Sequence, residues 1–287
     1  MTASPRDRQP TDPVREAPKP RLDPDSWLSV EIVSIGRELL RGVVADRNAP
    51  QLATRFTGQG ARIERITIVN DSAKCIGQAV VDALDRGAQL VVTTGGLGPA
   101  ADDGTLKAIA EFLQRPLTIQ QAARDMVEQA YRRLRDSGQA REGLNAGREK
   151  MCELPIGSAP VANPVGVAPG MFLRLTGGAV VLCLPGSPDE VSGVLDEAWP
   201  RLKELLSHAF VAQREVETPT VDESSLGPLL ERLADEFPGV WVKSLAPGFS
   251  DGAPVRVALE AGGSSRYEAE QTVESALRRL LDLARTR

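Results

Sequence analysis

The sequence has few aromatic residues and no large excess of either charge. Phe, Trp and Tyr make up 4% of the 287 residues, and 34 Lys and Arg stand against 39 Asp and Glu, for a net charge of -5. A dedicated nucleic-acid-binding protein needs a basic face or rings on which bases stack. The composition therefore argues against nucleic-acid binding, while 41% apolar residues suffice for an ordinary buried core.

Cysteine and histidine are scarce. The three cysteines, Cys75, Cys152 and Cys183, are odd in number and far apart. They offer neither a disulfide framework nor a CxxC zinc site, and they fit a reducing, cytoplasmic compartment. The single histidine, His208, rules out His-dependent catalytic triads and multi-histidine metal sites, and we expect it at the end of a helix.

Long apolar runs are missing as well. No stretch of about 18 apolar residues occurs, so we expect no membrane span. The beginning of the chain is rich in Pro, Arg and Asp and lacks the apolar segment of a signal peptide. We expect residues 1–27 to be a disordered extension.

The next part of the sequence alternates between strand and helix patterns. Apolar, β-branched strands are predicted at 28–36, 61–70 and 90–93, with helices at 48–57 and 73–86 between them. This order, with short Gly-containing connections, indicates right-handed crossovers in an α/β fold with a doubly wound, mainly parallel sheet. Further helices are expected at 105–113, 119–137 and 192–209, with a hairpin turn at 176–178.

Two folded domains are expected. The α/β domain would span residues 28–210. After residue 211 the pattern changes to strand, helix, strand, strand and helix, which is typical of a small two-layer α+β module over 211–287.

The segment Thr93 to Asp103, TTGGLGPAADD, is the strongest functional signal. Its glycines, directly after a buried strand, let main-chain N–H groups approach a phosphate, and the following helix offers its positive end. Asp102 and Asp103 would repel that phosphate unless a divalent cation lay between them, which predicts a Mg²⁺-type site at one or both. The alternative is that one of them only caps the helix.

Three more loops rich in glycine follow predicted strands or lie close to them. They are Gly36 to Gly42, Asn163 to Gly170 and Leu184 to Glu190. Each alone is a weak turn signal. Because ligands of parallel sheets bind beyond the carboxyl ends of the strands, we expect the four loops to form one pocket.

Charged and polar residues in and after the first of these loops have two interpretations. Arg37 or Arg41 could meet a ligand phosphate, and Asp46 could bind metal or ribose. The alternative is a solvated turn in which Asp46 or Asn48 is the N-cap of the next helix.

At the four loops the sequence resembles the N-terminal domain of the CinA (competence/damage-inducible protein A) family, itself similar to the molybdopterin-binding MogA and MoaB proteins. The family's G-T/D-E-L-L-x-G, T-T-G-G-L-G-P-T-x-D-D, N-P-x-G-x-A-P-G and L-P-G-x-P-x-E are seen at 36–42, 93–103, 163–170 and 184–190. The resemblance runs from about Val30 to Leu206, and the block from Arg214 to Leu283 looks like the small KH-like module that follows this domain in the family. No counterpart of the amidase domain of full-length CinA is found, so its deamidase activity is not expected.

The resemblance implies a function that a pocket of glycine-rich loops can serve. One possibility is a hydrolase of a diphosphate bond, of the ADP-ribose pyrophosphatase type, with Mg²⁺ or else Mn²⁺ or Co²⁺. The alternative is a molybdopterin-binding protein of molybdenum cofactor biosynthesis. Arg37 and Ala100 differ from the family's usual residues, which favours a third alternative, a non-catalytic nucleotide-binding sensor.

The resemblance also implies site residues and partners. The candidate catalytic residues are Asp46, Asp102, Asp103 and Lys150, and the three aspartates are also the candidate metal ligands. The candidate ligand-binding residues are Gly36, Glu38, Asn48, Thr94, Gly95, Gly96, Gly98, Asn163, Gly166, Gly170, Pro185, Gly186 and Glu190. The expected partner is a small nucleotide or pterin phosphate, and the expected assembly is a homodimer, with a trimer as the alternative.

Overall fold

The computed structural model describes residues 27–139, 145–206, 210–220, 222–245, 254–263 and 265–285. The extension expected over 1–27, apart from Trp27, and the helix end expected at His208 lie outside these ranges. The chain divides into two compact units, a larger one that contains residues 29–53 and 63–204 and a smaller one that contains the residues from 205 onward. Within the described ranges, no helix is long and apolar enough to cross a membrane.

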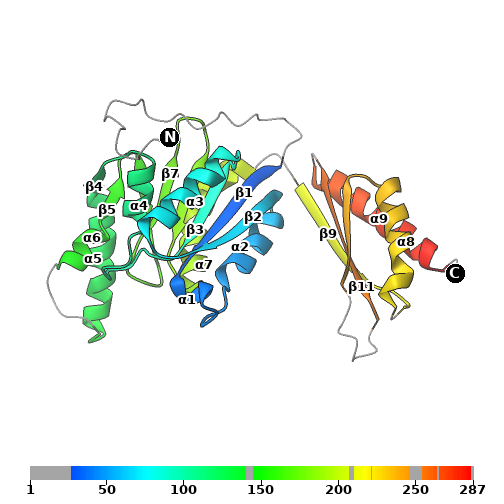
Figure 1. Ribbon diagram of the computed structural model, residues 1–287, viewed down its shortest axis with the longest axis horizontal. Coiled ribbons are helices and arrows are strands. Elements are labelled where there is room, and N and C mark those ends of the chain that lie inside the picture. Colours follow the sequence, from blue (N-terminus) through cyan, green and yellow to red (C-terminus); the bar gives the residue numbers. More distant parts are fainter. Residues whose placement is uncertain are drawn as a thin grey trace, which may run out of the picture. The chain divides into compact units, whose positions relative to one another are not determined.

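A six-stranded sheet with the order β2-β1-β3-β8-β7-β6 forms the centre of the larger unit (Figure 1). Its strands are β1 (Leu28–Ile35), β2 (Ala61–Val69), β3 (Leu90–Thr94), β6 (Ser158–Val161), β7 (Gly170–Arg174) and β8 (Val180–Leu184). Strands β1, β3 and β8 run parallel, whereas β7 and β6 are antiparallel to their neighbours. The predicted α/β fold with a mainly parallel sheet is confirmed.

The middle of the sheet is buried on both faces. Every residue of β3 and of β8 is buried, as continuous apolar strands are when helices cover both sides of a parallel sheet. The long helices of this unit are α2 (Asn48–Thr57), α3 (Ala73–Asp85), α4 (Thr105–Phe112), α5 (Gln121–Asp136) and α7 (Pro188–Leu206). The predicted bounds of α2 are confirmed, and α3 begins after the N-cap Ser72, which accepts a hydrogen bond from Cys75 N–H.

The start of α7 differs from the prediction. A helix was expected from residue 192, but it begins at Pro188. Ser187 donates its hydroxyl to Glu190 Oε2 at 2.6 Å, and Pro is favoured in the first position of a helix because its missing N–H has no helical partner there. The last residues of the fourth loop are therefore the first turn of α7.

No bounds were predicted for four short elements. They are α1 (Arg37–Leu40), α6 (Ala146–Lys150) and the two-stranded antiparallel sheet of β4 (Leu117–Ile119) and β5 (Glu153–Pro155). One of them, β5, lies in a segment expected to form loops and short strands. Elements of three to five residues are too short to show a helical or strand period in the sequence. The pairing of β4 with β5 also moves the start of the following helix from residue 119 to Gln121.

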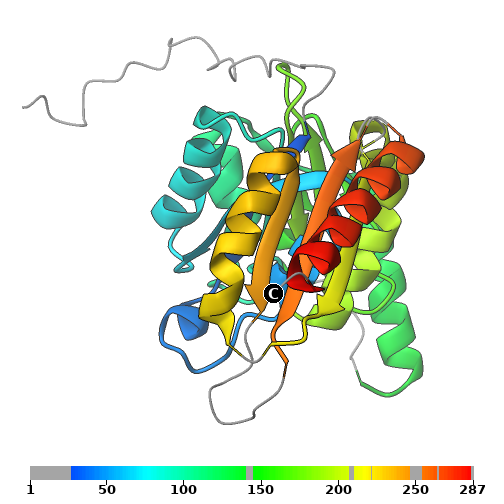
Figure 2. The same ribbon diagram turned by 90° about the vertical axis from the view of Figure 1, so that its right-hand side faces the viewer.

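The smaller unit has the expected order of strand, helix, strand, strand and helix. Its elements are β9 (Phe210–Glu217), α8 (Glu223–Glu236), β10 (Val240–Leu245), β11 (Arg256–Gly263) and α9 (Arg266–Arg285). The three strands pair antiparallel in the order β10-β11-β9, and both helices cover one face of this sheet (Figure 2). Asp222 caps α8 by accepting a hydrogen bond from Ser224 N–H at 2.9 Å.

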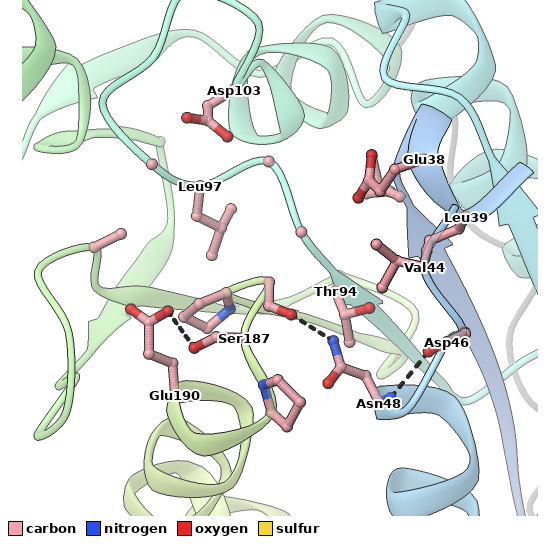
Figure 3. A pocket seen from close by; sticks show the side chains of 18 of the residues that line it. Glu38, Leu39, Val44, Asp46, Asn48, Thr94, Leu97, Asp103, Ser187 and Glu190 are labelled. Carbon is pink, nitrogen blue, oxygen red and sulfur yellow. Dashed lines mark hydrogen bonds between the residues drawn. The ribbon is translucent and has the colours of Figure 1, made fainter. Parts of the chain in front are cut away.

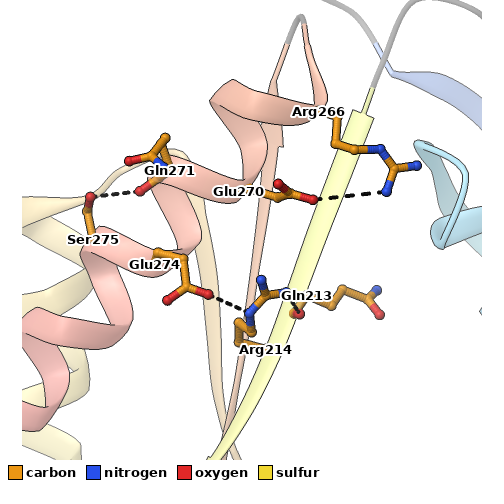
Figure 4. A network of polar contacts seen from close by, with 7 residues as sticks. All are labelled: Gln213, Arg214, Arg266, Glu270, Gln271, Glu274 and Ser275. Atoms are coloured by element: carbon orange, nitrogen blue, oxygen red, sulfur yellow. Dashed lines mark hydrogen bonds and ion pairs between the residues drawn. The ribbon is translucent and has the colours of Figure 1, made fainter.

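Several ion pairs lie on the surface of the smaller unit. Arg214 on β9 pairs with Glu274 on α9 at 2.6 Å, and Arg266 pairs with Glu270 at 4.0 Å (Figure 4). Exposed pairs of this kind contribute roughly 0–1 kcal/mol each. The apolar core, which contains Leu280 at 0% exposure, therefore supplies most of the stability of this unit.

One buried charge in the larger unit depends on a single partner. Glu31 on β1 is 2% exposed, and Arg86, the C-cap of α3, donates to both of its carboxylate oxygens, at 2.8 and 2.6 Å. Removal of one partner of such a pair leaves a buried charge without compensation.

We expect Arg86→Ala to lower the free energy of unfolding by about 2–3 kcal/mol, less than for a fully buried pair because the Arg86 side chain is 37% exposed. Urea unfolding measures the loss. The double variant Glu31→Gln with Arg86→Ala should be more stable than Arg86→Ala alone, because no buried charge is then left. An equal loss in both variants would contradict the explanation.

Candidate functional site

A pocket of about 620 Å³ lies where β1, β3 and β8 end. All four glycine-rich loops contribute to its walls, through residues such as Glu38, Gly96, Val167 and Gly186. The structure thus brings together residues as far apart in the sequence as Ile35 and Glu190. A cavity of several hundred Å³ is of the size that holds a small-molecule ligand or cofactor.

The predicted site residues divide into those that line the pocket and those that do not. In the walls are Glu38, Asp46, Asn48, Thr94, Gly95, Gly96, Gly98, Asp103, Pro185, Gly186 and Glu190. Outside the walls are Gly36, Asp102, Lys150, Asn163, Gly166 and Gly170. The wall also contains residues that were not predicted to belong to the site, among them Leu39, Val44, Arg47, Leu97, Val167 and Ser187.

The loop after β3 is held in a conformation that only glycine adopts easily. Gly95 and Gly96 have φ values of 101° and 69°, in the left-handed region that favours glycine. Gly95 N–H donates to the carbonyls of Leu184 and Pro185, both at 3.0 Å. Thr105, the first residue of α4, donates its hydroxyl to the Gly95 carbonyl at 2.9 Å and its N–H to the Gly96 carbonyl at 3.1 Å.

This conformation leaves three consecutive donors free. The N–H groups of Gly96, Leu97 and Gly98 have no hydrogen-bond acceptor in the part of the chain that the structure describes. All three residues line the pocket. Consecutive main-chain N–H groups of this kind bind anions such as phosphate.

Asp103 and Asp102 are placed differently. Asp103 lines the pocket and accepts a hydrogen bond from Ala100 N–H on Oδ2 at 2.9 Å, while its Oδ1 has no partner among the described residues. Asp102 is exposed and lies outside the walls. The N-cap of α4 is Gly104, and neither carboxylate accepts a hydrogen bond from a described N–H group of the first turn of this helix. The structure therefore does not support the helix-cap interpretation of this acidic pair.

Lys150 supports the loop rather than the pocket wall. Its Nζ donates to the main-chain carbonyls of Ala100 and Asp103, the latter at 2.8 Å. Burial lowers the pKa of Lys150, although the nearby carboxylates of Asp103 and Asp102 act in the opposite direction. Lys150 therefore holds the main chain around Asp103 in place.

Asp46 is fully engaged in hydrogen bonds. Its Oδ1 accepts from the N–H groups of Asn48 and Ala49, at 2.9 and 3.1 Å, and its Oδ2 accepts from the Ser34 hydroxyl at 2.5 Å. These contacts fix the start of α2 against the end of β1, as an N-cap does. Metal binding by Asp46 stays a prediction. In this structure both carboxylate oxygens of Asp46 bind protein donors and position α2 against β1.

Asn48 joins α2 to the loop after β8. Its side-chain Nδ2 donates to the Gly186 carbonyl at 2.7 Å (Figure 3). A carbonyl oxygen can only accept, so this contact fixes the orientation of the amide. The side-chain Oδ1 of Asn48 is buried and has no partner among the described residues.

Asn163, which lies outside the wall, and Glu190, which is part of it, shape the third loop. Asn163 donates to Glu190 Oε1 at 2.9 Å and accepts from Gly166 N–H at 2.7 Å, while Glu190 Oε2 accepts from Ser187. Any side chain at residue 166 would collide with Glu190. Asn163 and Gly166 therefore determine the conformation of this loop, and its residues Val167 and Ala168 form the wall.

The pocket carries more negative than positive side chains. Among the described residues, the acidic ones in the wall are Glu38, Asp46, Asp103 and Glu190, and the basic one is Arg47. Within the described ranges, no group of three or more His, Cys, Asp or Glu side chains gathers as a metal site. Arg37, expected to meet phosphate, instead pairs with Asp71 at 3.3 Å and, like Arg41, lies outside the walls.

The fold and the site define a class of protein: an α/β domain with a pocket of glycine-rich loops at the carboxyl edge of its sheet. The chain belongs to the family described as "Probable molybdopterin binding domain", whose profile matches residues 31–204. That range contains all four loops.

Similar proteins support this assignment. The crystal structure of CinA from Thermoplasma acidophilum is 32% identical, covers 61% of this chain and 98% of its own, and superimposes with a TM-score of 0.55. A protein of Aeropyrum pernix is 37% identical over 259 residues, 90% of this chain and 92% of its own length. A protein of Caldivirga maquilingensis is 35% identical over 257 residues, 89% and 96% of the two chains. The predicted resemblance to CinA is confirmed.

The contacts of Lys150 lead to a test of loop support. We expect Lys150→Met to lower the free energy of unfolding by about 1–3 kcal/mol, because the carbonyls of Ala100 and Asp103 lose their charged donor. Hydrogen exchange of the amides from residue 100 to 105 should become faster. Lys107→Met, at an exposed lysine of α4, is the control, and equal exchange in both variants would refute the supporting role.

Proposed function

We propose that the pocket binds a phosphate-bearing nucleotide and that the chain hydrolyses the diphosphate bond of an ADP-ribose-like substrate with the help of a divalent cation. One observation carries this proposal. The uncommitted Oδ1 of Asp103 belongs to the same loop and the same pocket as the three free N–H groups of Gly96, Leu97 and Gly98.

The free N–H groups would hold one phosphate of the ligand. The first turn of α7 supports the same role, because Ser187, Pro188 and Glu190 line the pocket and a helix N-terminus carries a partial positive charge. The opposite wall offers the apolar side chains of Leu39 and Val44 (Figure 3). Such a surface suits the ring system of a nucleotide or a pterin.

The side chains of the pocket fit a hard cation such as Mg²⁺. Asp103 has one free carboxylate oxygen, and the carboxylate of Glu38 has no hydrogen bond to any described residue. Mg²⁺ is commonly bound by one or two carboxylates together with substrate phosphates rather than by a complete protein cage. Asp103 and Glu38 would hold the cation, which supplies neutralisation of the phosphate charge.

The proposed reaction adds water across the bond between the two phosphates. A bond forms between the water oxygen and one phosphorus, the bridging P–O bond breaks, and ADP-ribose yields AMP and ribose 5-phosphate. The N–H groups of Gly96 to Gly98 stabilise the negative charge on the phosphate oxygens. The water must lose a proton, and Glu38 is our candidate acceptor, because one of its two carboxylate oxygens stays uncommitted when the other holds the cation.

Two adjacent aspartates provide a matched test. We expect Asp103→Asn to lower the rate of AMP release from ADP-ribose, with Mg²⁺, Mn²⁺ or Co²⁺ present, by about 100-fold or more, as loss of a group that acts in the transition state does. Asp102→Asn removes the same charge from a side chain outside the pocket and should cost threefold at most, roughly the effect of a distant surface charge. Chromatographic measurement of AMP gives both rates.

Other results would redirect the proposal. Equal losses in the two variants would contradict the assignment of Asp103. If the wild-type protein released no AMP with any of the three metals, hydrolysis would be excluded. Stabilisation against heating by ADP-ribose without turnover would then favour the nucleotide-binding sensor.

A second candidate function is molybdopterin binding in molybdenum cofactor biosynthesis. The match to the molybdopterin-binding family favours it, and the same free N–H groups would hold the pterin phosphate. It requires binding of molybdopterin by the purified protein and loss of molybdoenzyme activity in a strain that lacks the gene. The homodimer and the cytoplasmic location also stay predictions.

A further inference from the structure

Arg47 is a basic residue of the pocket wall, and its guanidinium group has no acidic partner among the described residues. It lines the cavity, it is exposed, and it forms no hydrogen bond or ion pair with the residues that the structure describes. Two other arginines of this unit differ in this respect, because Arg37 pairs with Asp71 and Arg86 with Glu31. The guanidinium of Arg47 is thus available to a ligand.

The main chain on both sides of Arg47 is fixed. Asp46 is tied to Ser34 and caps α2, and Asn48 is tied to the Gly186 carbonyl. These contacts hold the Cα of Arg47 at the pocket, so a ligand has to order only the side chain. The entropy cost of binding is therefore limited to a few rotamers.

Arg47 and the free N–H groups come from different elements. Arg47 directly precedes α2, whereas Gly96 and Gly98 belong to the loop between β3 and α4. The pocket therefore has two separate groups that can bind an anion. Guanidinium groups bind phosphate oxygens in pairs, with a geometry that an ammonium cannot reproduce.

We infer that Arg47 binds a second phosphate and that the pocket therefore selects diphosphates over monophosphates. The inference rests on the proposed function for the class of ligand, and it adds the residue that distinguishes the members of that class. The other charged side chains of the wall are acidic, so without Arg47 a second phosphate would meet no compensating cationic side chain among the described wall residues.

Calorimetric titration of the whole chain, at a fixed concentration of free Mg²⁺, tests this inference. The probes are two matched pairs, ADP-ribose with AMP and inorganic pyrophosphate with inorganic phosphate. We expect Arg47→Ala to weaken the binding of the diphosphates about 10- to 100-fold, the range of a charge-assisted hydrogen bond. The binding of the monophosphates should weaken about twofold at most. Arg47→Lys should restore only part of the loss, because a lysine makes no paired contact.

Arg65→Ala is the control, because Arg65 is an exposed arginine of β2 outside the pocket. It should leave all four affinities unchanged. Equal weakening of diphosphates and monophosphates in Arg47→Ala would mean that Arg47 acts only through its long-range field, and an unchanged diphosphate affinity would mean that it makes no contact. Either result overturns the inference.

The titration separates this inference from the proposed hydrolysis. A protein that selects pyrophosphate through Arg47 but releases no AMP supports the inference and refutes the reaction. If the wild type and Arg47→Ala hydrolyse ADP-ribose equally well, the reaction is supported and the role of Arg47 is refuted. If neither nucleotide binds, the inorganic pair decides, and a wild-type protein without preference for pyrophosphate overturns the role of Arg47.

Discussion

The pocket depends on the hydrogen bonds that fix Gly95 at the end of β3. Its N–H is bound by two carbonyls at the end of β8, and its carbonyl is bound by the hydroxyl of Thr105 at the start of α4. The main chain must then turn through two left-handed residues, Gly95 and Gly96. The N–H groups that follow have no protein acceptor in the described part of the chain. Unpaired donors are costly when buried, so a site that exposes them to a ligand is a physically reasonable use of this turn.

Much of the fold could be predicted because the capping residues and the pattern of apolar residues indicated the same helices and strands. The strand β3 begins with three apolar residues and is buried throughout. Helix α2 has Asp46 at one end and Gly58 at the other, so its bounds follow from capping alone. The start of α7 could not be read in the same way. Ser187 and Pro188 are equally typical of a turn, and only the contact between Ser187 and Glu190 distinguishes the two. The domain bounds at 28, 210 and 211 stay predictions.

The candidate site was predictable at the level of loops but not of side chains. Adjacent residues in a loop point in different directions according to φ and ψ, so no sequence signal separates Asp103, in the wall, from Asp102, outside it. Arg47 lies in the sequence between the predicted site residues Asp46 and Asn48. Nothing in the sequence distinguished it from an ordinary charged residue of the surface. For Asn163 the motif signal concerned the loop conformation, and its contacts with Gly166 and Glu190 show why.

The division of the pocket carboxylates is compatible with the anion binding that the proposed function requires. Asp46 and Glu190 have both oxygens engaged by protein donors, which stabilise their charge in place. Asp103 and Glu38 retain free oxygens, so their charge acts directly on whatever enters. Repulsion between these carboxylates and a phosphate falls when a cation lies between them. In the proposed function, cation and phosphate must therefore strengthen each other's binding, and by linkage each does so to the same extent.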